Sequence, residues 1–224
     1  MSAKPRLLLP DTNVIIEAMR RERWVQLCAA YEVVVPSIIA NEMDFFPDLT
    51  TPGKRHHVTL APLTHGKHNF VLNEPASGAG AAGGAAPAPD PAGGEFLVWA
   101  APVAEFNATK ALLHPDLRER VDEGEQEAVT YLRLLDDEAS AGVAFATADV
   151  GGILATVAFD RTHCAVSLES ILRKCGYSAA LANEFRDSHV HACVRDGQIR
   201  VAQGRALADT TAAAISQARV PRRR

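Results

Sequence analysis

Residues 7–19 read Leu-Leu-Leu-Pro-Asp-Thr-Asn-Val-Ile-Ile-Glu-Ala-Met, an apolar run followed at once by an amphipathic pattern. The apolar run predicts a buried strand, and the spacing of Val14 and Ala18 predicts a helix. Asp11 therefore falls where a strand meets a helix. In an open α/β sheet this edge lines the ligand crevice, so a carboxylate there is expected to hold a cation or a substrate. The alternative is that Asp11 caps the helix, which aspartate does readily.

Strands and helices alternate further along the chain. Residues 33–35 form a β-branched run, and Ser37 is placed to cap a helix that carries Glu42. Residues 143–148 form another apolar run, which ends at Asp149 just before another helix. Because this alternation is typical of βαβ units, it predicts an α/β fold with a parallel sheet covered on both faces.

The length of 224 residues suits one domain with an insertion. Residues 77–94 consist almost wholly of glycine, alanine and proline, so they bury too little side-chain surface to order themselves and are expected to form a flexible surface loop. The flanking segments contain apolar residues, which places the loop inside a domain covering residues 1–176. Residues 177–224 are expected to be a C-terminal extension.

The extension is predicted to contain a β-hairpin, a helix and a basic tail. Residues 190–194 and 198–202 flank Asp196 and Gly197, a dipeptide suited to a type I′ turn. The helix is expected at residues 206–218. The arginine-rich end that follows it is suited to contact phosphate, although such termini are more often only solvated.

Charge and composition exclude several classes of protein. The net charge of −4 and pI of about 6.1 give no overall basic field, so a nucleic acid would be bound through local patches or metal ions. The four cysteines form no Cys-x-x-Cys pair and no apolar leader follows Met1, which predicts a reduced cytoplasmic protein. No apolar run approaches the roughly 18 residues of a spanning helix, so no membrane role is expected. His189 and His191 have a spacing that zinc uses, but no cysteine joins them, and they are predicted to be surface or hairpin histidines.

Four acidic residues occupy comparable places in this pattern, namely Asp11, Glu42, Glu125 and Asp149. If the sheet is parallel, all four converge on one of its edges. Carboxylates that share a site repel one another and raise one another's pKa, so the set is unfavourable unless a cation neutralises it. Mg²⁺ or Mn²⁺ fits, because these hard ions prefer oxygen ligands and leave room for a substrate phosphate. Such an ion would activate a bound water and stabilise the charge of an in-line phosphoryl displacement.

Each of these acids also has an ordinary structural interpretation. Glu125 is spaced to complete a capping box with Asp122, which is also the competing ligand. For Glu42 the alternative is a solvated helix residue, with Asp44 as the competing choice, but its position between Ile39 and Met43 favours an inward side chain. Asp11 and Asp149 are the acids whose strand-end positions most favour metal binding.

Four short motifs resemble those of the PIN-domain nucleases, which include the VapC-type toxin ribonucleases. They are Asp-Thr-Asn at 11–13, Ile-Ile-Ala-Asn-Glu-Met at 38–43, Gly-Glu-Gln-Glu-Ala at 124–128 and Thr-Ala-Asp at 147–149. Each motif recurs by chance, but their order is specific, and together they span most of residues 6–170. The resemblance implies a three-layer α/β/α sandwich with a central, mainly parallel sheet, and a divalent metal held by the four acids. It also implies that Asn13 and Thr147 orient the ligands.

The function implied by this resemblance is metal-dependent hydrolysis of RNA phosphodiester bonds by an endoribonuclease. The expected partner is an RNA substrate, and an antitoxin protein and a second copy of the chain are the other partners considered. One alternative is a non-catalytic PIN-like scaffold that binds RNA or a protein. Another is a phosphatase of the haloacid-dehalogenase type with Asp11 as nucleophile, which is disfavoured because position 13 is asparagine rather than a second aspartate.

Overall fold

The computed structural model describes residues 7–43, 45–47, 55–63, 66–73 and 94–203. Asp44, nearly all of the predicted loop at 77–94, the predicted helix at 206–218 and the basic tail lie outside the described residues. In the part of the chain that is described, no helix is long and apolar enough to cross a membrane.

Strands and helices alternate in the described residues except between residues 45 and 99, where strands follow one another. In the first half they are β1 (Leu7–Pro10), α1 (Thr12–Arg20), α2 (Trp24–Ala30), β2 (Glu32–Pro36), α3 (Ser37–Glu42), β3 (Phe45–Pro47), β4 (Arg55–Pro62) and β5 (Lys67–Asn73). In the second half they are β6 (Phe96–Trp99), α4 (Val103–Leu112), α5 (Pro115–Arg118), α6 (Glu123–Leu134), α7 (Asp137–Ser140), β7 (Val143–Ala146), α8 (Val150–Ala158), η2 (Thr162–Cys164), β8 (Ala165–Val166), α9 (Leu168–Lys174), η3 (Asn183–Phe185) and α10 (Asp187–Ala202).

These strands form one mixed sheet in the order β3-β4-β5-β6-β2-β1-β7-β8. From β6 to β8 neighbouring strands are parallel, and Leu8 of β1 lies opposite both Val33 of β2 and Ala144 of β7. From β3 to β6 neighbouring strands are antiparallel. The fold is therefore α/β, with an antiparallel arm that the alternation of strands and helices does not predict. Antiparallel strands need only a short turn, and Gly66 between β4 and β5 has a φ of 73°, which glycine adopts without steric cost.

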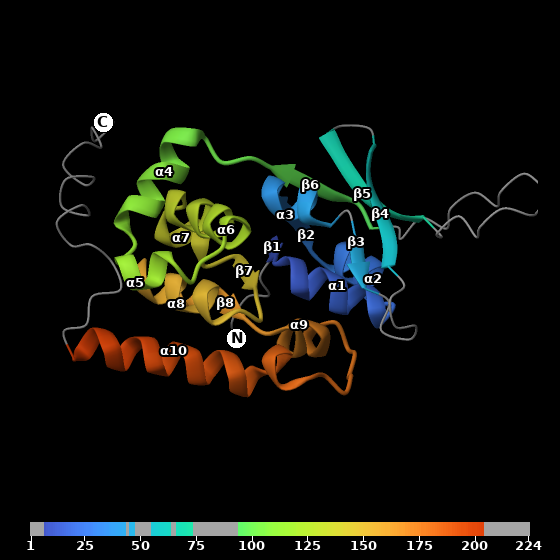
Figure 1. Cartoon of the computed structure of the whole chain (residues 1–224). Helices are drawn as coiled ribbons and strands as arrows, with labels where there is room; N and C mark the ends of the chain where they lie inside the picture. Colours follow the sequence, from blue (N-terminus) through green and yellow to red (C-terminus); the bar gives the residue numbers. More distant parts are fainter. Residues whose placement is uncertain (1–6, 44, 48–54, 64–65, 74–93, 204–224) are drawn as a thin grey trace, which may run out of the picture.

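Side chains of the central strands alternate between two hydrophobic cores, one on each face of the sheet. Leu8 and Val33 pack with residues of α1, α2 and α9, whereas Leu9 and Val34 pack with residues of α6 and α8. Figure 1 shows these two groups of helices on opposite sides of the central strands. Burial of each such side chain contributes about 1.5–3 kcal/mol. Because β1 and β7 are apolar along their whole length, the first acids appear only beyond their carboxyl ends.

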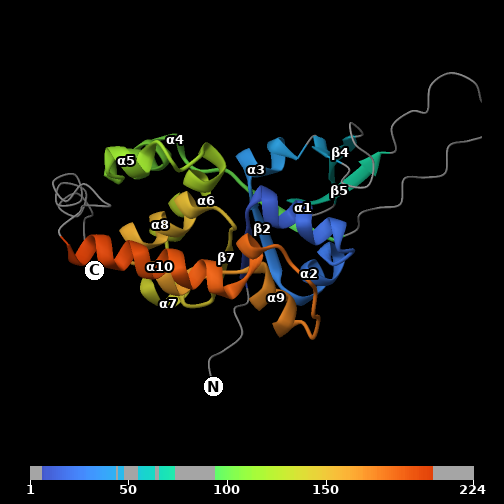
Figure 2. The same cartoon turned by 60° about the horizontal axis from the view of Figure 1, so that its bottom comes forward.

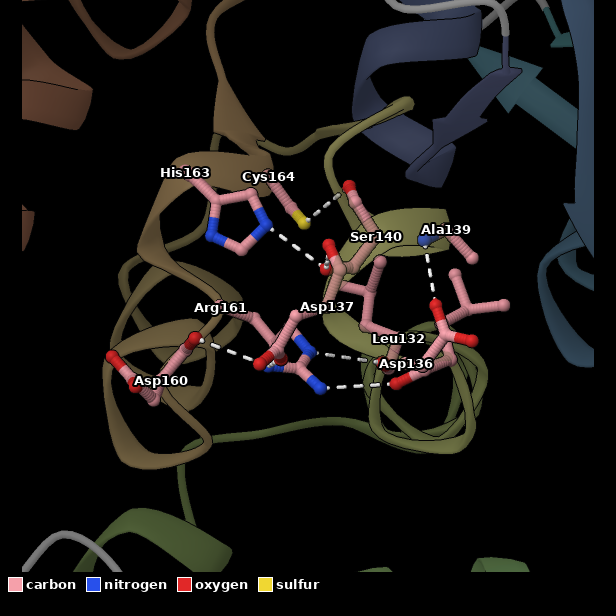
Figure 3. Close-up of polar contacts among 10 residues, drawn as sticks. Leu132, Asp136, Asp137, Ala139, Ser140, Asp160, Arg161, His163 and Cys164 are labelled. Carbon is pink, nitrogen blue, oxygen red and sulfur yellow. Dashed lines mark hydrogen bonds and ion pairs between the residues drawn. The ribbon is translucent and has the colours of Figure 1, made fainter.

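The C-terminal end of α6 is held by the guanidinium group of Arg161 (Figure 3). Its Nε donates to the carbonyl of Leu132 at 3.3 Å and its Nη2 donates to the carbonyl of Leu135 at 3.0 Å. Carbonyls at a helix end lack partners within the helix, so these bonds satisfy them. Nη1 also pairs with Asp137 at 2.9 Å, which ties α7 to the same point. This anchorage fixes the helix whose first turn carries Glu125.

The predicted β-hairpin in the C-terminal extension is wrong. Residues 187–202 form the single helix α10, and Asp196 and Gly197 lie inside it. Val190 and Gly197, seven residues apart, are buried on one helical face, and Arg200 pairs with Asp196 at 2.7 Å one turn earlier. The turn preference of the Asp-Gly dipeptide is local, and tertiary packing overrides it.

Gly197 is the point of close approach between α10 and α8. A Cβ atom at this position would lie 2.9 Å from Cδ2 of Leu154 and 3.0 Å from Cγ2 of Val157. These distances are shorter than ordinary van der Waals contact, so only glycine lets the two helices approach this closely. Figure 2 shows α10 lying alongside α8.

Gly197→Leu is expected to lower the free energy of unfolding by about 1–3 kcal/mol, because the added side chain overpacks the contact with Leu154 and Val157. Urea unfolding followed by circular dichroism measures the change. Ala192→Leu, at an exposed position of the same helix, is the matched control and should leave the unfolding midpoint nearly unchanged. Equal stability of Gly197→Leu and the wild type would contradict the close approach of α10 to α8.

Candidate functional site

Asp11 is buried at the carboxyl end of β1, with 3% of its surface exposed. Its backbone N–H donates to the carbonyl of Ala146 at 2.9 Å, which places it beside the end of β7. Its Oδ1 accepts the N–H of Thr12 at 2.6 Å and so caps α1, while Oδ2 lies 3.2 Å from the hydroxyl of Thr147. One carboxylate thus serves as a helix cap and also faces the neighbouring strand end.

Glu125 lies in the first turn of α6, with 1% of its surface exposed. It forms the expected capping box, because Oε2 accepts the N–H of Asp122 at 3.3 Å and Asp122 accepts the N–H of Glu125 at 2.7 Å. The other oxygen, Oε1, points away from the cap and accepts the N–H of Gly152 at 3.2 Å. Glu125 therefore caps α6 through Oε2, and its Oε1 remains for a role in the site.

Thr147 lies between these two buried carboxyl groups. Its hydroxyl is 3.2 Å from Asp11 and 3.5 Å from Oε1 of Glu125, and it accepts the N–H of Asp149 at 3.0 Å. A hydroxyl has one proton to donate, so it satisfies one carboxylate at a time. Thr147 is thus placed to orient both acids, which is the kind of role expected for it from the sequence.

Asp149 begins α8 at the carboxyl end of β7. It is exposed, and its Oδ1 accepts the N–H of Gly151 at 2.6 Å, which caps the helix. Its charge raises the pKa values of both Asp11 and Glu125, so it lies within electrostatic reach of each. Asp11, Glu125 and Asp149 therefore gather at one edge of the sheet, where parallel β1 and β7 end.

Glu42 reaches the same region from the end of α3. It is exposed, yet its Oε2 accepts the hydroxyl proton of Thr12 at 2.6 Å, and a Cβ on Gly124 would lie 3.4 Å from its Oε1. Thr12 is a residue that the sequence analysis did not select, although a hydroxyl next to Asp11 was an available signal. Asn13, which was expected to orient ligands, is exposed on α1, and it is Thr12 that contacts a site acid.

The buried carboxyl groups are electrostatically strained in the charged form. Burial raises the pKa of Asp11 to about 7, with additional contributions from the charges of Asp122 and Asp149. Burial raises the pKa of Glu125 to about 9, with additional contributions from Asp149, Asp11 and Asp122. Asp122, the alternative ligand from the sequence, therefore contributes charge to both acids from the exposed side of the α6 cap.

Two glycines let α8 pack against this cluster. A Cβ on Gly152 would lie 2.6 Å from Oε1 of Glu125, so a larger residue would displace the carboxyl group. A Cβ on Gly151 would collide with the carbonyl of Arg120 in the segment leading to α6. The Gly-Gly pair at the start of α8 is thus required by close approach of backbone to the site.

Glu127 is the second buried acid of α6, and it connects α6 to α3. Its carboxylate accepts the N–H groups of Ile38 and Ala101, each at 2.8 Å, and the hydroxyl of Ser37 at 2.9 Å. The expectation that Ser37 caps its own helix is wrong, because Ser37 is the first residue of α3 and Glu127 supplies the capping oxygens. This contact sets α3, and with it Glu42, relative to α6 and Glu125.

The donor set suits a hard divalent cation. Carboxylate and hydroxyl oxygens surround the site, and positive charge would relieve the repulsion that raises the pKa values of Asp11 and Glu125. Among the described residues, no three histidine, cysteine or acidic side chains already stand at the spacing of a metal site. Binding would therefore require the acidic side chains to move closer together.

Comparisons of the chain with protein-family models, with curated proteins and with solved structures found no match. The resemblance to PIN-domain nucleases therefore stays a prediction from four short motifs.

The metal-free protein is expected to lose stability as pH rises. The folded-state pKa values of Asp11 and Glu125 lie above their ordinary values near 4, so the folded chain binds protons more tightly than the unfolded chain. This stability is complete below about pH 4 and is lost as pH rises through about 7 for Asp11 and about 9 for Glu125, by up to about 1.4 kcal/mol per pH unit for one proton. Urea unfolding in EDTA at a series of pH values measures the slope.

Asp11→Asn should remove the contribution of Asp11 to this loss, so the slope between about pH 4 and pH 7 becomes shallower, while the contribution of Glu125 continues over that range and up to about pH 9. Asp116→Asn is the matched control, because the side chain of Asp116 is 89% exposed and lies outside the cluster. Parallel stability curves for Asp11→Asn and the wild type over that range would show that the carboxyl group of Asp11 is not strained.

Proposed function

We propose that the chain is a metal-dependent endoribonuclease with a PIN-like α/β/α sandwich, and that Asp11, Glu42, Glu125 and Asp149 hold its Mg²⁺ or Mn²⁺. The observation that carries the proposal is the pair of buried carboxyl groups, Asp11 and Glu125, within hydrogen-bonding distance of one hydroxyl of Thr147. Helix capping alone would not require the carboxyl groups of Asp11 and Glu125 to be buried next to each other.

The charge balance supports a cation as the missing component. Burial, Asp122 and Asp149 disfavour the charged form of both Asp11 and Glu125, and the charge of Asp11 adds to the effect on Glu125. When bound, a divalent cation supplies positive charge to a phosphate group and promotes ionisation of a water molecule. The acids of this chain would bind the cation in their deprotonated state.

The remaining residues have distinct tasks in this proposal. Thr147 orients the buried carboxyl groups of Asp11 and Glu125, and Thr12 orients the exposed carboxyl group of Glu42. Asp149 and Glu42 form the solvent-facing side of the cluster, where a substrate can approach. Asp11 and Glu125 thus form the buried part of the cluster, and Asp149 and Glu42 form the exposed part that contacts the substrate in this proposal.

RNA is the substrate that the order of the four motifs favours. The assignment to RNA comes from the resemblance, while the acidic cluster supports phosphodiester chemistry in general. Single-stranded DNA and a phosphomonoester are therefore the substrates that an assay must compare with RNA.

The purified protein is expected to cleave RNA in Mg²⁺ or Mn²⁺ and to lose this activity in EDTA. Asp11→Asn and Asp149→Asn should lower the rate by about 10- to 100-fold or more, because each removes a ligand charge. Gel analysis of labelled RNA measures the cleavage, with Asp116→Asn as the exposed acidic control.

Three other results would overturn the proposal in different ways. RNA cleavage that persists in EDTA, with contaminating nuclease excluded, would reject the metal mechanism. Hydrolysis of the phosphomonoester alone would indicate a phosphatase. RNA binding without cleavage in either metal would indicate a non-catalytic scaffold.

A further inference from the structure

The helix α10 brings a histidine to the edge of the acidic site. Nε2 of His189 lies 3.1 Å from the carbonyl oxygen of Ala148, although the two residues are 41 positions apart in the chain. His189 is half-buried, and α10 lies against both α8 and β8. Figure 2 shows α10 crossing beside α8 and α9. The helix that replaces the predicted hairpin is thus in direct contact with the end of β7.

The carbonyl that His189 contacts belongs to the segment that presents the site. Ala148 stands between Thr147, whose hydroxyl lies between the buried carboxyl groups, and Asp149, which caps α8. The backbone N–H of Asp149 donates back to the hydroxyl of Thr147 at 3.0 Å. Rotation of the peptide that carries the Ala148 carbonyl would therefore disturb both Thr147 and Asp149.

The hydrogen bond determines what His189 contributes. A carbonyl oxygen accepts, so Nε2 carries the proton and donates it to Ala148. Cys193, one turn later on α10, has its sulfur 3.8 Å from the same nitrogen and limits movement of the ring. His189 thus holds the carbonyl side of a peptide group whose N–H side is held by the hydroxyl of Thr147.

We propose that His189 is a positioning residue of the acidic site, which holds the Thr147–Asp149 segment in place through the carbonyl of Ala148. The inference rests on the proposed function only for its effect on metal binding. The C-terminal helix is then part of the site, and residues beyond the four motifs contribute to it.

Two substitutions at position 189 separate hydrogen bonding from simple packing. His189→Gln retains a side-chain N–H at a similar distance from the backbone, whereas His189→Leu fills the space without a donor. His191→Leu is the matched control, because His191 is exposed on the same helix. All three are compared with the wild type in the full chain.

The first measurement is amide hydrogen exchange at Asp149, Gly151 and Gly152, whose N–H groups bond within the site. We expect exchange there to be faster in His189→Leu, close to wild type in His189→Gln and unchanged in His191→Leu. The second measurement is Mn²⁺ affinity by titration calorimetry, which should fall by about 10-fold in His189→Leu and be restored in His189→Gln.

Each result decides the proposal. Unchanged exchange at these amides in His189→Leu would overturn it, even if the melting temperature fell, because His189 would then only pack. Loss of protection in His189→Gln equal to that in His189→Leu would also overturn it. If the wild type binds no Mn²⁺, the proposed function fails, and the exchange comparison alone still decides whether His189 holds the strand end.

Discussion

The carboxyl groups of Asp11 and Glu125 are buried within hydrogen-bonding distance of one threonine hydroxyl. The rest of the site depends on how the surrounding groups stabilise these two carboxyl groups. Burial and neighbouring acids raise both pKa values, so simultaneous ionisation of the pair is disfavoured. Backbone N–H groups of Thr12, Asp122 and Gly152 offset this only in part. Positive charge from a bound cation would offset the remaining cost of ionising Asp11 and Glu125, and the proposed function is based on this requirement.

The fold brings these acids together by the direction of its strands. Because β1 and β7 are parallel neighbours, Asp11 and Asp149 follow strand ends at the same edge of the sheet. The first turn of α6 adds Glu125 to that edge, and the glycines at the start of α8 leave room for its carboxyl group. Arg161 at the other end of α6 and Glu127 within it connect this helix to its surroundings, so the position of Glu125 is fixed at several points.

The strand-end acids were accessible to sequence reasoning because the apolar runs before Asp11 and Asp149 are each followed by an aspartate and a helical pattern. The prediction of a capping box for Glu125 agrees with the structure, and the same residue also faces the cluster. The failures have different causes. The antiparallel arm precedes the glycine-rich insertion in the sequence and interrupts the βαβ alternation, and Asp196-Gly197 resembles a turn although Gly197 packs against α8. The contact of His189 lies 41 residues away, which no local pattern contains, and the hydroxyl of Thr12 was a signal next to Asp11 although its partner Glu42 lies 30 residues away.

The proposed function requires that Asp11, Glu42, Glu125 and Asp149 together bind a divalent cation. Anomalous X-ray scattering from crystals soaked in Mn²⁺ tests it most directly, since manganese is located without reference to activity. We expect a manganese peak at coordination distance from carboxylate oxygens of Asp11 and Asp149, and no such peak in Asp11→Asn. Manganese found only away from this edge of the sheet, with the Thr147 hydroxyl still beside Asp11 and Glu125, would contradict it.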